Sequence, residues 1–200
     1  MAAAPPDRRT RRKLELRGRM LEAAAALFDA CGVHATKVAD ICARADVAQK
    51  TFFNHFESKG QLLRELAEEA SQQLLVDIET ARKEGRGTRG RLERFFAGVA
   101  ERAAVAGPMH RELLTELIHA IHASGTEPDQ ARRLHAAFGA LVRDGLAAGD
   151  VTKRHTPETL TEMVMGAYYA LMFNWANLDG YPIREQARAA ARFLADALEG

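Results

Sequence analysis

Two short stretches of helical periodicity, separated by a two-residue break, constrain the fold of this chain more than any other feature. Apolar residues recur at the spacing of one helix face over 37–45, and a second short helix is expected over 48–53, after Asp46-Val47. The small side chain of Cys42 allows the two helices to cross closely, and Phe52 can lock the second helix onto the first. This pattern predicts a helix-turn-helix.

Longer helices flank this pair. A first helix is expected over 11–31 with Gly32 as its stop, and its buried face is formed by Met20, Ala24, Leu27, Phe28 and Cys31. Thr36 is expected to cap the second helix. Ser58 and Gln61 form a capping box that opens a fourth helix ending near residue 82. Residues 1–10 lack periodicity and are expected to form a disordered basic tail.

The rest of the chain is expected to form a larger helical domain that begins after a linker. The segment 83–90 contains three glycines in eight residues and marks that linker. Further helices are expected over 91–106, 108–123, 127–148, 157–177 and 182–198. No segment alternates as a strand would, so the predicted fold class is all-α, with about nine helices. We therefore expect a tail over 1–10, a helix-turn-helix domain over 11–58, a connecting helix over 59–82 and the larger domain over 83–200.

The composition argues against a membrane-spanning or secreted protein and shows an uneven distribution of charge. No run approaches the roughly 18 apolar residues of a membrane-spanning helix, and the N-terminus lacks the apolar stretch of a secretory signal. The two cysteines suit a reducing cytoplasm, where we expect the protein. The net charge is +1, but residues 1–64 hold 12 Lys/Arg against 7 Asp/Glu, and the remainder holds 16 against 20. This asymmetry is expected when one end meets phosphates, although a solvated tail over 8–13 alone supplies the excess.

The outer face of the helix over 48–53 is rich in hydrogen-bond donors. Val47, Phe52 and Phe56 are expected to pack on its inner side. The outer side chains able to bond to bases or phosphates are Gln49, Lys50, Thr51, Asn54 and His55. Such a helix fits a DNA major groove about 12 Å wide.

The same region has a family resemblance. Leu21–Leu63, containing GVHATKVADICARADVAQKTFFNHFESKGQLL, closely resembles the DNA-binding domain of the tetracycline-repressor (TetR) family. The matching positions are Thr36, Ile41, Val47, Thr51, Phe53, His55-Phe56 and Ser58-Lys59. The departures are Cys42 for the usual Ala, Asp46 for a turn Gly, Lys50 for a frequent Gly and Phe53 for a Tyr. Asp accepts a left-handed backbone, and Phe53 is expected to pack without the phosphate bond of a Tyr, a loss for which Lys50 can compensate.

The chemistry of these side chains and the family resemblance together predict which of them contact DNA phosphates and which contact bases. The Thr36 hydroxyl and the Lys59 ammonium are expected to meet phosphates, with Lys37 as a further candidate. His55 serves either as a phosphate donor or in packing. Because Gln and Asn suit adenine and Lys suits guanine, base edges are expected to meet Gln49, Lys50, Thr51 and Asn54. Phe53 completes the expected DNA-facing set.

The C-terminal domain is expected to dimerise and to hold an effector. Residues 160–177 are apolar nearly all round, so this helix is expected to be buried on every face, between the core and a partner subunit. The resemblance implies that the last two helices pair with their copies, and a two-fold dimer suits a pseudo-palindromic DNA site. It also implies a cavity for a small apolar or amphipathic effector, with candidate lining residues Phe95, Met109, Leu113, Leu117, Phe138, Met165, Tyr168, Tyr169 and Met172.

Other functions have weaker support. His119 and His122 could ligate a metal from one helix face, but no Cys or carboxylate cluster completes a site. Cys31 and Cys42 could form a redox switch, but both are expected on buried faces, where cysteines are usually inert. No phosphate loop, nucleophile elbow or cofactor motif argues for an enzyme. The prediction is a ligand-responsive transcription regulator, by family default a repressor, without cofactor or metal; a helical adaptor or a small enzyme is the alternative.

Overall fold

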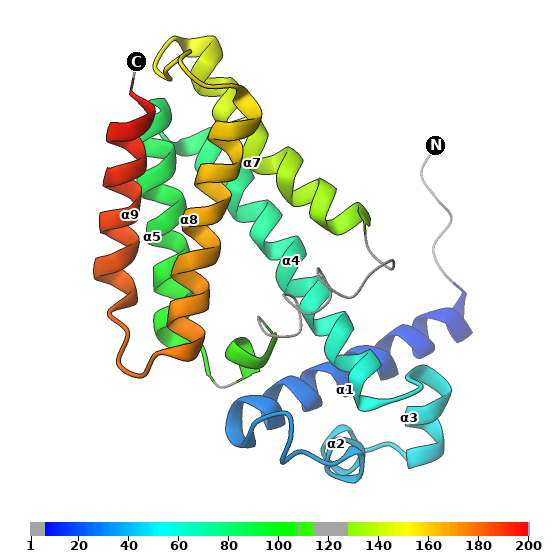
Figure 1. Cartoon of the computed structure of the whole chain (residues 1–200). Coiled ribbons are helices and arrows are strands. Elements are labelled where there is room, and N and C mark those ends of the chain that lie inside the picture. Colours follow the sequence, from blue (N-terminus) through cyan, green and yellow to red (C-terminus); the bar gives the residue numbers. More distant parts are fainter. Residues whose placement is uncertain (1–6, 108, 114–127, 200) are drawn as a thin grey trace. The chain divides into compact units, whose positions relative to one another are not determined.

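The computed structural model describes residues 7–107, 109–113 and 128–199, and in these ranges the regular structure is α-helical. The helices are α1 (Arg8–Cys31), α2 (Val38–Ala45), α3 (Gln49–His55), α4 (Lys59–Glu84), α5 (Gly87–Val105), α7 (Pro128–Ala148), α8 (Pro157–Asn177) and α9 (Ile183–Leu198) (Figure 1). The predicted all-α fold class is confirmed. Of the helix expected over 108–123, the described residues 109–113 are helical. Among the described helices, none combines the length and the apolar character that crossing a membrane would need.

The chain forms two compact units. The first unit comprises the described residues of 1–67 and 107–113, and the second comprises those of 68–106 and 114–200. Helix α4 therefore begins in the first unit and continues into the second. The segment 107–113, which follows α5 in sequence, packs with the first unit, and nothing in the periodicity of the sequence indicated this.

The core of the first unit forms along one face of α1. Met20, Ala24 and Phe28 recur at four-residue intervals and are fully buried. They pack with Ile41 and Cys42 of α2 and with the other buried apolar residues of this unit, which are Ala23, Val33, Ala45, Phe52, Phe56, Leu62, Leu63, Leu66, Ala67, Met109 and Leu113. The expected inward faces of the first four helices are therefore largely correct. Cys31 is an exception, because the last turn of α1 leaves its thiol exposed.

The turn between α2 and α3 is made by a non-glycine residue with a left-handed backbone. Asp46 has a φ of 51°, and among the described non-glycine residues it alone has a positive φ. Its amide donates to Ala43 O at 3.3 Å, which closes the last turn of α2. The expectation that Asp would accept this conformation is confirmed.

Local capping fixes several helix ends as predicted. The Ser58 hydroxyl accepts a bond from Gln61 N at 3.1 Å, while Gln61 Oε1 accepts one from Glu57 N at 2.6 Å. Two helix starts differ from expectation. α1 begins at Arg8 rather than residue 11, because the carboxylate of Asp7 caps it through Thr10 N at 2.6 Å. The N-cap of α2 is Lys37, one residue after Thr36.

The expected linker over 83–90 is wrong. α4 continues to Glu84 and α5 begins at Gly87, so two residues separate the helices. The cause is a distant cap: the Asp150 carboxylate accepts bonds from Thr88 N at 2.8 Å and Thr88 Oγ1 at 2.7 Å. Gly87 permits the sharp entry with a φ of 65°. The glycines therefore serve a tight turn.

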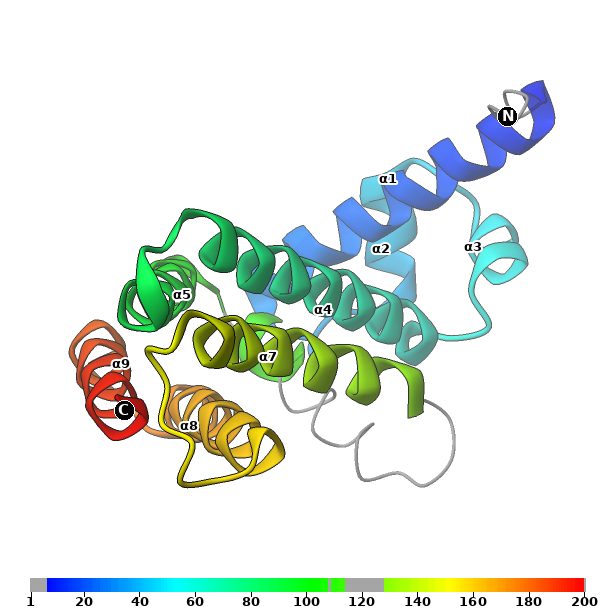
Figure 2. The same cartoon turned by 90° about the horizontal axis from the view of Figure 1, so that it is seen from above.

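The second unit consists of helices packed in antiparallel and crossed pairs. α5 lies along α9, and α7 lies along α8 (Figure 2). Thr156 caps α8 through Thr159 N at 3.2 Å, with Pro157 in the first turn, as expected. The apolar helix α8 is not covered on every face within the unit, because Met163 and Phe173 are 56% and 54% exposed.

Candidate functional site

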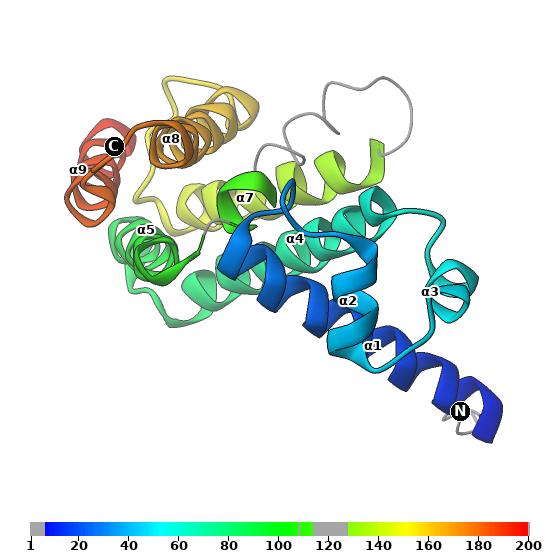
Figure 3. The same cartoon turned by 90° about the horizontal axis from the view of Figure 1, so that it is seen from below.

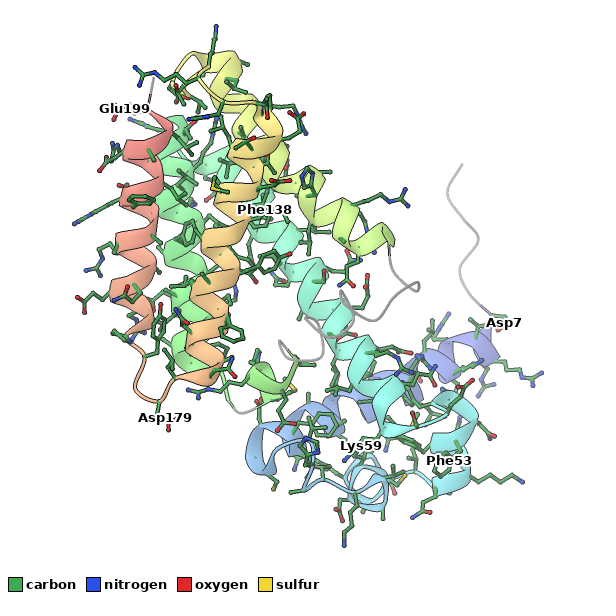
Figure 4. The ribbon with its side chains drawn as sticks, viewed as in Figure 1. Asp7, Phe53, Lys59, Phe138, Asp179 and Glu199 are labelled. Atoms are coloured by element: carbon green, nitrogen blue, oxygen red, sulfur yellow. The ribbon has the colours of Figure 1, made fainter. Side chains whose placement is uncertain are left out.

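Helix α3 presents one exposed face that carries most of the expected DNA-facing residues. Gln49, Lys50, Phe53 and Asn54 are exposed, at the i, i+1, i+4 and i+5 positions of one helix face, and Thr51 is half-buried beside them. Figure 4 labels Phe53 on this helix. The expectation that Phe53 would pack is wrong in part: its ring contacts Phe52 edge-on but stays 53% exposed. The face thus offers amide and ammonium donors around an apolar ring.

The opposite face of α3 is anchored by aromatic packing. Phe52 and Phe56 are fully buried, and their ring centroids lie 5.5 Å apart. Burying an aromatic side chain contributes roughly 2–3 kcal/mol, so a seven-residue helix that would be unstable alone is held in one orientation. The polar face must consequently point outward.

Two arginines of α1 support the ends of this helix-turn-helix. Arg17 Nη1 donates to His55 O at 2.7 Å, and the same guanidinium binds the Glu65 carboxylate and covers the Phe56 ring at 4.3 Å. Arg19 Nη2 donates to Ala45 O, at the end of α2, and lies beside Asp46. Both satisfy carbonyls at helix C-termini, where a cation also opposes the helix dipole. The sequence analysis missed both residues, since nothing in the spacing of α1 distinguishes them from solvated arginines.

Thr36 is not available to a phosphate in this structure. Its side chain is buried, and Oγ1 donates to Gly32 O at 2.9 Å. The hydroxyl therefore fixes the loop between α1 and α2, and the expected phosphate role is not supported. Lys37 beside it is exposed, and its backbone amide donates to Asp40 Oδ2 at 3.1 Å.

Lys59 is half-buried and turned toward the backbone of that same loop. Its Nζ donates to Val33 O at 2.6 Å and to Thr36 O at 2.8 Å (Figure 4). An ammonium has three donors, so one remains for another acceptor. Lys59 thus ties the start of α4 to the start of α2, and its expected phosphate contact would be an additional bond.

His55 lies half-buried at the end of α3, with a buried Nδ1 that has no hydrogen-bond partner among the described residues. Burial lowers the pKa of His55, and the positive charges of Arg17 and Lys13 lower it further. The imidazole is therefore held neutral. Of the two expected roles, this geometry favours packing at the end of α3 over a cationic phosphate contact.

The segment 107–113 completes the first unit. Directly after α1, the Val33 amide donates to both oxygens of the Glu112 carboxylate, at 3.0 and 3.1 Å. Met109 and Leu113 are buried in the first unit's core. They therefore belong to the core of the first unit, whereas the other expected effector residues that the structure describes belong to the core of the second, a division that helix periodicity could not reveal.

Four of the expected effector residues meet in the second unit as an aromatic cluster. Phe95 of α5, Phe138 of α7 and Tyr168 of α8 have ring centroids 5.4 to 5.8 Å apart, and Tyr169 lies 5.5 Å from Tyr168. Figure 4 labels Phe138 in this cluster. Met165 and Met172 pack against the same core. Leu117 lies outside the described residues.

A charged pair lies beside this aromatic cluster. Arg102 Nη2 is 2.5 Å from Asp77 Oδ2, and Gln73 Nε2 donates to Asp77 Oδ1 at 3.1 Å. Burial raises the pKa of Tyr168; Tyr169 and Asp77 raise it further, while Arg102 opposes them. The phenol is thus neutral and close to both charges. The second unit thereby places an acidic and a basic group next to stacked rings.

Other candidate sites find no support in the described residues. A hollow between α5 and α9 is lined by Glu93, Glu101, Arg184, Arg188 and three alanines, and none of the expected effector residues belongs to it. No group of three His, Cys, Asp or Glu residues in the described ranges could hold a metal ion. His119 and His122 fall outside those ranges.

The comparisons with known proteins agree with this geometry. Residues 20–66 match the family described as bacterial regulatory proteins, tetR family. A TetR-family transcriptional regulator from Pectobacterium atrosepticum is 20% identical, with a TM-score of 0.76 over 97% of this chain and 98% of that one. FadR from Thermus thermophilus, a TetR-family repressor in complex with lauroyl-CoA, is 22% identical, with a TM-score of 0.62 over 89% and 92%. RolR in complex with resorcinol is 17% identical, with a TM-score of 0.66 over 94% and 90%.

No curated protein matches the chain significantly. At these identities the solved structures establish a shared fold over nearly the whole chain, and the family match rests on the helix-turn-helix itself.

Proposed function

We propose that this chain, a member of the tetR family of bacterial regulatory proteins through its residues 20–66, represses transcription in the cytoplasm as a homodimer that an effector releases from DNA. The observation that carries this proposal is the exposed face of α3, with Gln49, Lys50 and Asn54 outward and Phe52 locked inward. Side chains of these types read base edges in the major groove. Lys37 and the third donor of Lys59 supply phosphate contacts.

The aromatic cluster of the second unit supports an apolar or amphipathic effector. Rings and methionines can pack against an apolar body, and the Asp77–Arg102 pair can bond to a polar group. The neighbours differ in what they hold, lauroyl-CoA in one and resorcinol in another. The cluster of Phe95, Phe138, Tyr168 and Tyr169 therefore guides the choice of effector more directly than the neighbours do.

The last two helices support the dimer. Met163, Gly166, Ala170 and Phe173 form an exposed apolar stripe along α8, and Phe193 of α9 is 71% exposed. Apolar patches of this kind on paired helices are typical of subunit interfaces. We propose that α8 and α9 pack against their copies around a two-fold axis, which sets two α3 helices on one DNA duplex.

We propose that the effector releases the DNA by shifting the dimer toward conformers that do not fit the DNA site. The chain passes between the units within α4 and on either side of the segment 107–113, which Glu112 holds in the first unit. The two reading helices must lie about 34–36 Å apart, or a multiple of that, to enter successive major grooves. An effector that binds better to a conformer with another spacing lowers DNA affinity by its differential binding free energy.

The first test is fluorescence anisotropy of the full-length protein with the DNA flanking its coding sequence and with a scrambled duplex, at several salt concentrations. We expect selective binding that weakens with salt and saturates at two subunits per site or a multiple. Equally weak binding to both duplexes would reject the proposal. Titrating lauroyl-CoA and resorcinol into the complex then tests whether either class of effector releases the DNA.

A further inference from the structure

We infer that the first two turns of α1 form a second DNA-contact surface, in which Arg9, Arg12 and Lys13 bind backbone phosphates beside the bases facing α3. This inference rests on the proposed function and adds a contact outside the helix-turn-helix. Of its residues, the sequence analysis placed Arg9 in a disordered tail and Arg12 and Lys13 at the start of the first helix.

The charges of this segment are concentrated where a helix least favours them. Five of the six residues 8–13 are Lys or Arg, all are exposed, and the first turn of α1 contains no acidic residue. The N-terminus of a helix carries partial positive charge, so cations there destabilise it. Asp7 precedes them only as the cap. A bound polyanion such as DNA would offset the repulsion between these cations and the positive end of the helix dipole.

These cations have no partner in the folded chain. Within the described ranges, Arg8, Arg9, Arg11, Arg12 and Lys13 form no ion pair or side-chain hydrogen bond. Further along the same helix, Arg17 is bonded through all three guanidinium nitrogens, and Arg19 donates through Nη2 to Ala45 O. The arginines of α1 that pack beside the core are therefore bonded within the first unit, whereas those of its first two turns have no partner among the described residues.

The free cations lie on the side of α1 that faces the helix-turn-helix. Met20 and Leu16 pack inward, and continuing this stripe by three and four residues leads to Lys13 and Arg9. Lys13 lies close enough to His55, at the end of α3, for its charge to act on that imidazole. Arg12 lies seven residues before Arg19, which contacts the turn at Asp46. Figures 1 to 3 show α1 beginning on the side of the unit where α3 lies.

The geometry suits phosphates rather than bases. Arg9, Arg12 and Lys13 span about 6 Å along the helix axis, which is within the roughly 12 Å width of the major groove that α3 would enter. Guanidinium and ammonium groups on an exposed helix, with no pocket around them, match phosphate oxygens of either strand. The contact is therefore expected to add affinity at every sequence and to leave selectivity unchanged.

The test compares the salt dependence of DNA binding by full-length wild type and R9Q/R12Q/K13Q. Each lost phosphate contact reduces the slope of log K against log salt by about 0.9, so three contacts per subunit predict a reduction of about 5 for the dimer. We expect the ratio of affinities for the flanking and scrambled duplexes to stay within about threefold of wild type. R9K/R12K keeps the charges and should keep the slope.

The matched control is R86Q/K153Q/R154Q, which removes three exposed cations of the second unit outside α8 and α9 and should leave the slope near that of wild type. Thermal denaturation should show R9Q/R12Q/K13Q to be at least as stable as wild type, because cations near a helix N-terminus are removed. A wild-type slope in R9Q/R12Q/K13Q, or an equal loss in the control, would overturn this inference alone. Absence of salt-sensitive binding by the wild type would reject the proposed function, and this inference with it.

Discussion

At the scale of single residues, Asp46 decides how α2 turns into α3. Its left-handed backbone costs a side chain other than glycine about 1 kcal/mol, while its exposed carboxylate gains little from Arg19 at 3.4 Å. We expect Asp46→Gly to be at least as stable as wild type and Asp46→Ala to be about 1 kcal/mol less stable than Asp46→Gly. Urea denaturation of both variants measures this difference, and equal stability would show that the turn is not strained.

His55 provides a pH-dependent prediction at the same scale. Its pKa in the folded protein is lowered from 6.5 by burial and by two nearby cations. The unfolded chain therefore binds more protons below about pH 6.5, so the stability present above that pH is lost as the pH falls. Melting temperatures of wild type and His55→Gln between pH 5 and 8 test this. The variant should lose less stability on acidification; parallel curves would exclude His55 as the source.

At the scale of elements, Glu112 attaches the segment 107–113 to the end of α1. Hydrogen bonds to charged groups contribute about 1.5–3 kcal/mol, so Glu112→Ala should increase amide exchange at Val33 at least tenfold. Hydrogen exchange followed by NMR measures this, with Glu69→Ala on the exposed side of α4 as the control. Equal protection of Val33 in both variants would show that the Glu112 bond does not hold the segment.

At the scale of the whole molecule, the exposed apolar stripe of α8 and α9 predicts the oligomer. Phe193→Asp removes about 2 kcal/mol of apolar burial per subunit and places two carboxylates in one interface, so the dimer dissociation constant should rise at least about 100-fold. Analytical ultracentrifugation measures it. Val105→Asp changes an apolar residue of α5 that is even more exposed than Phe193 and should leave the dimer intact. A dimeric Phe193→Asp variant would place the interface elsewhere.

The sequence by itself determined the helices, their inward faces and the helix-turn-helix. Met20, Ala24 and Phe28 form one face because a helix repeats every 3.6 residues, and the caps at Ser58 and Thr156 act within one turn. The polar face of α3 follows from the same short-range rule. Such features depend on neighbours a few residues apart, which a single sequence displays directly.

Only the tertiary structure decided how polar groups are used. Lys59 and Val33 are 26 residues apart, and Glu112 and Val33 are 79 apart, so local periodicity holds no sign of either bond. Asp150 changed an expected linker into a tight turn for the same reason, because it lies 62 residues from Thr88. Thr36 differs, since its hydroxyl turned inward onto Gly32 O only four residues away. A buried donor or carbonyl must find a partner wherever the fold supplies one. The helices could therefore be predicted from nearby residues, whereas the partners of these side chains depended on how distant segments came together.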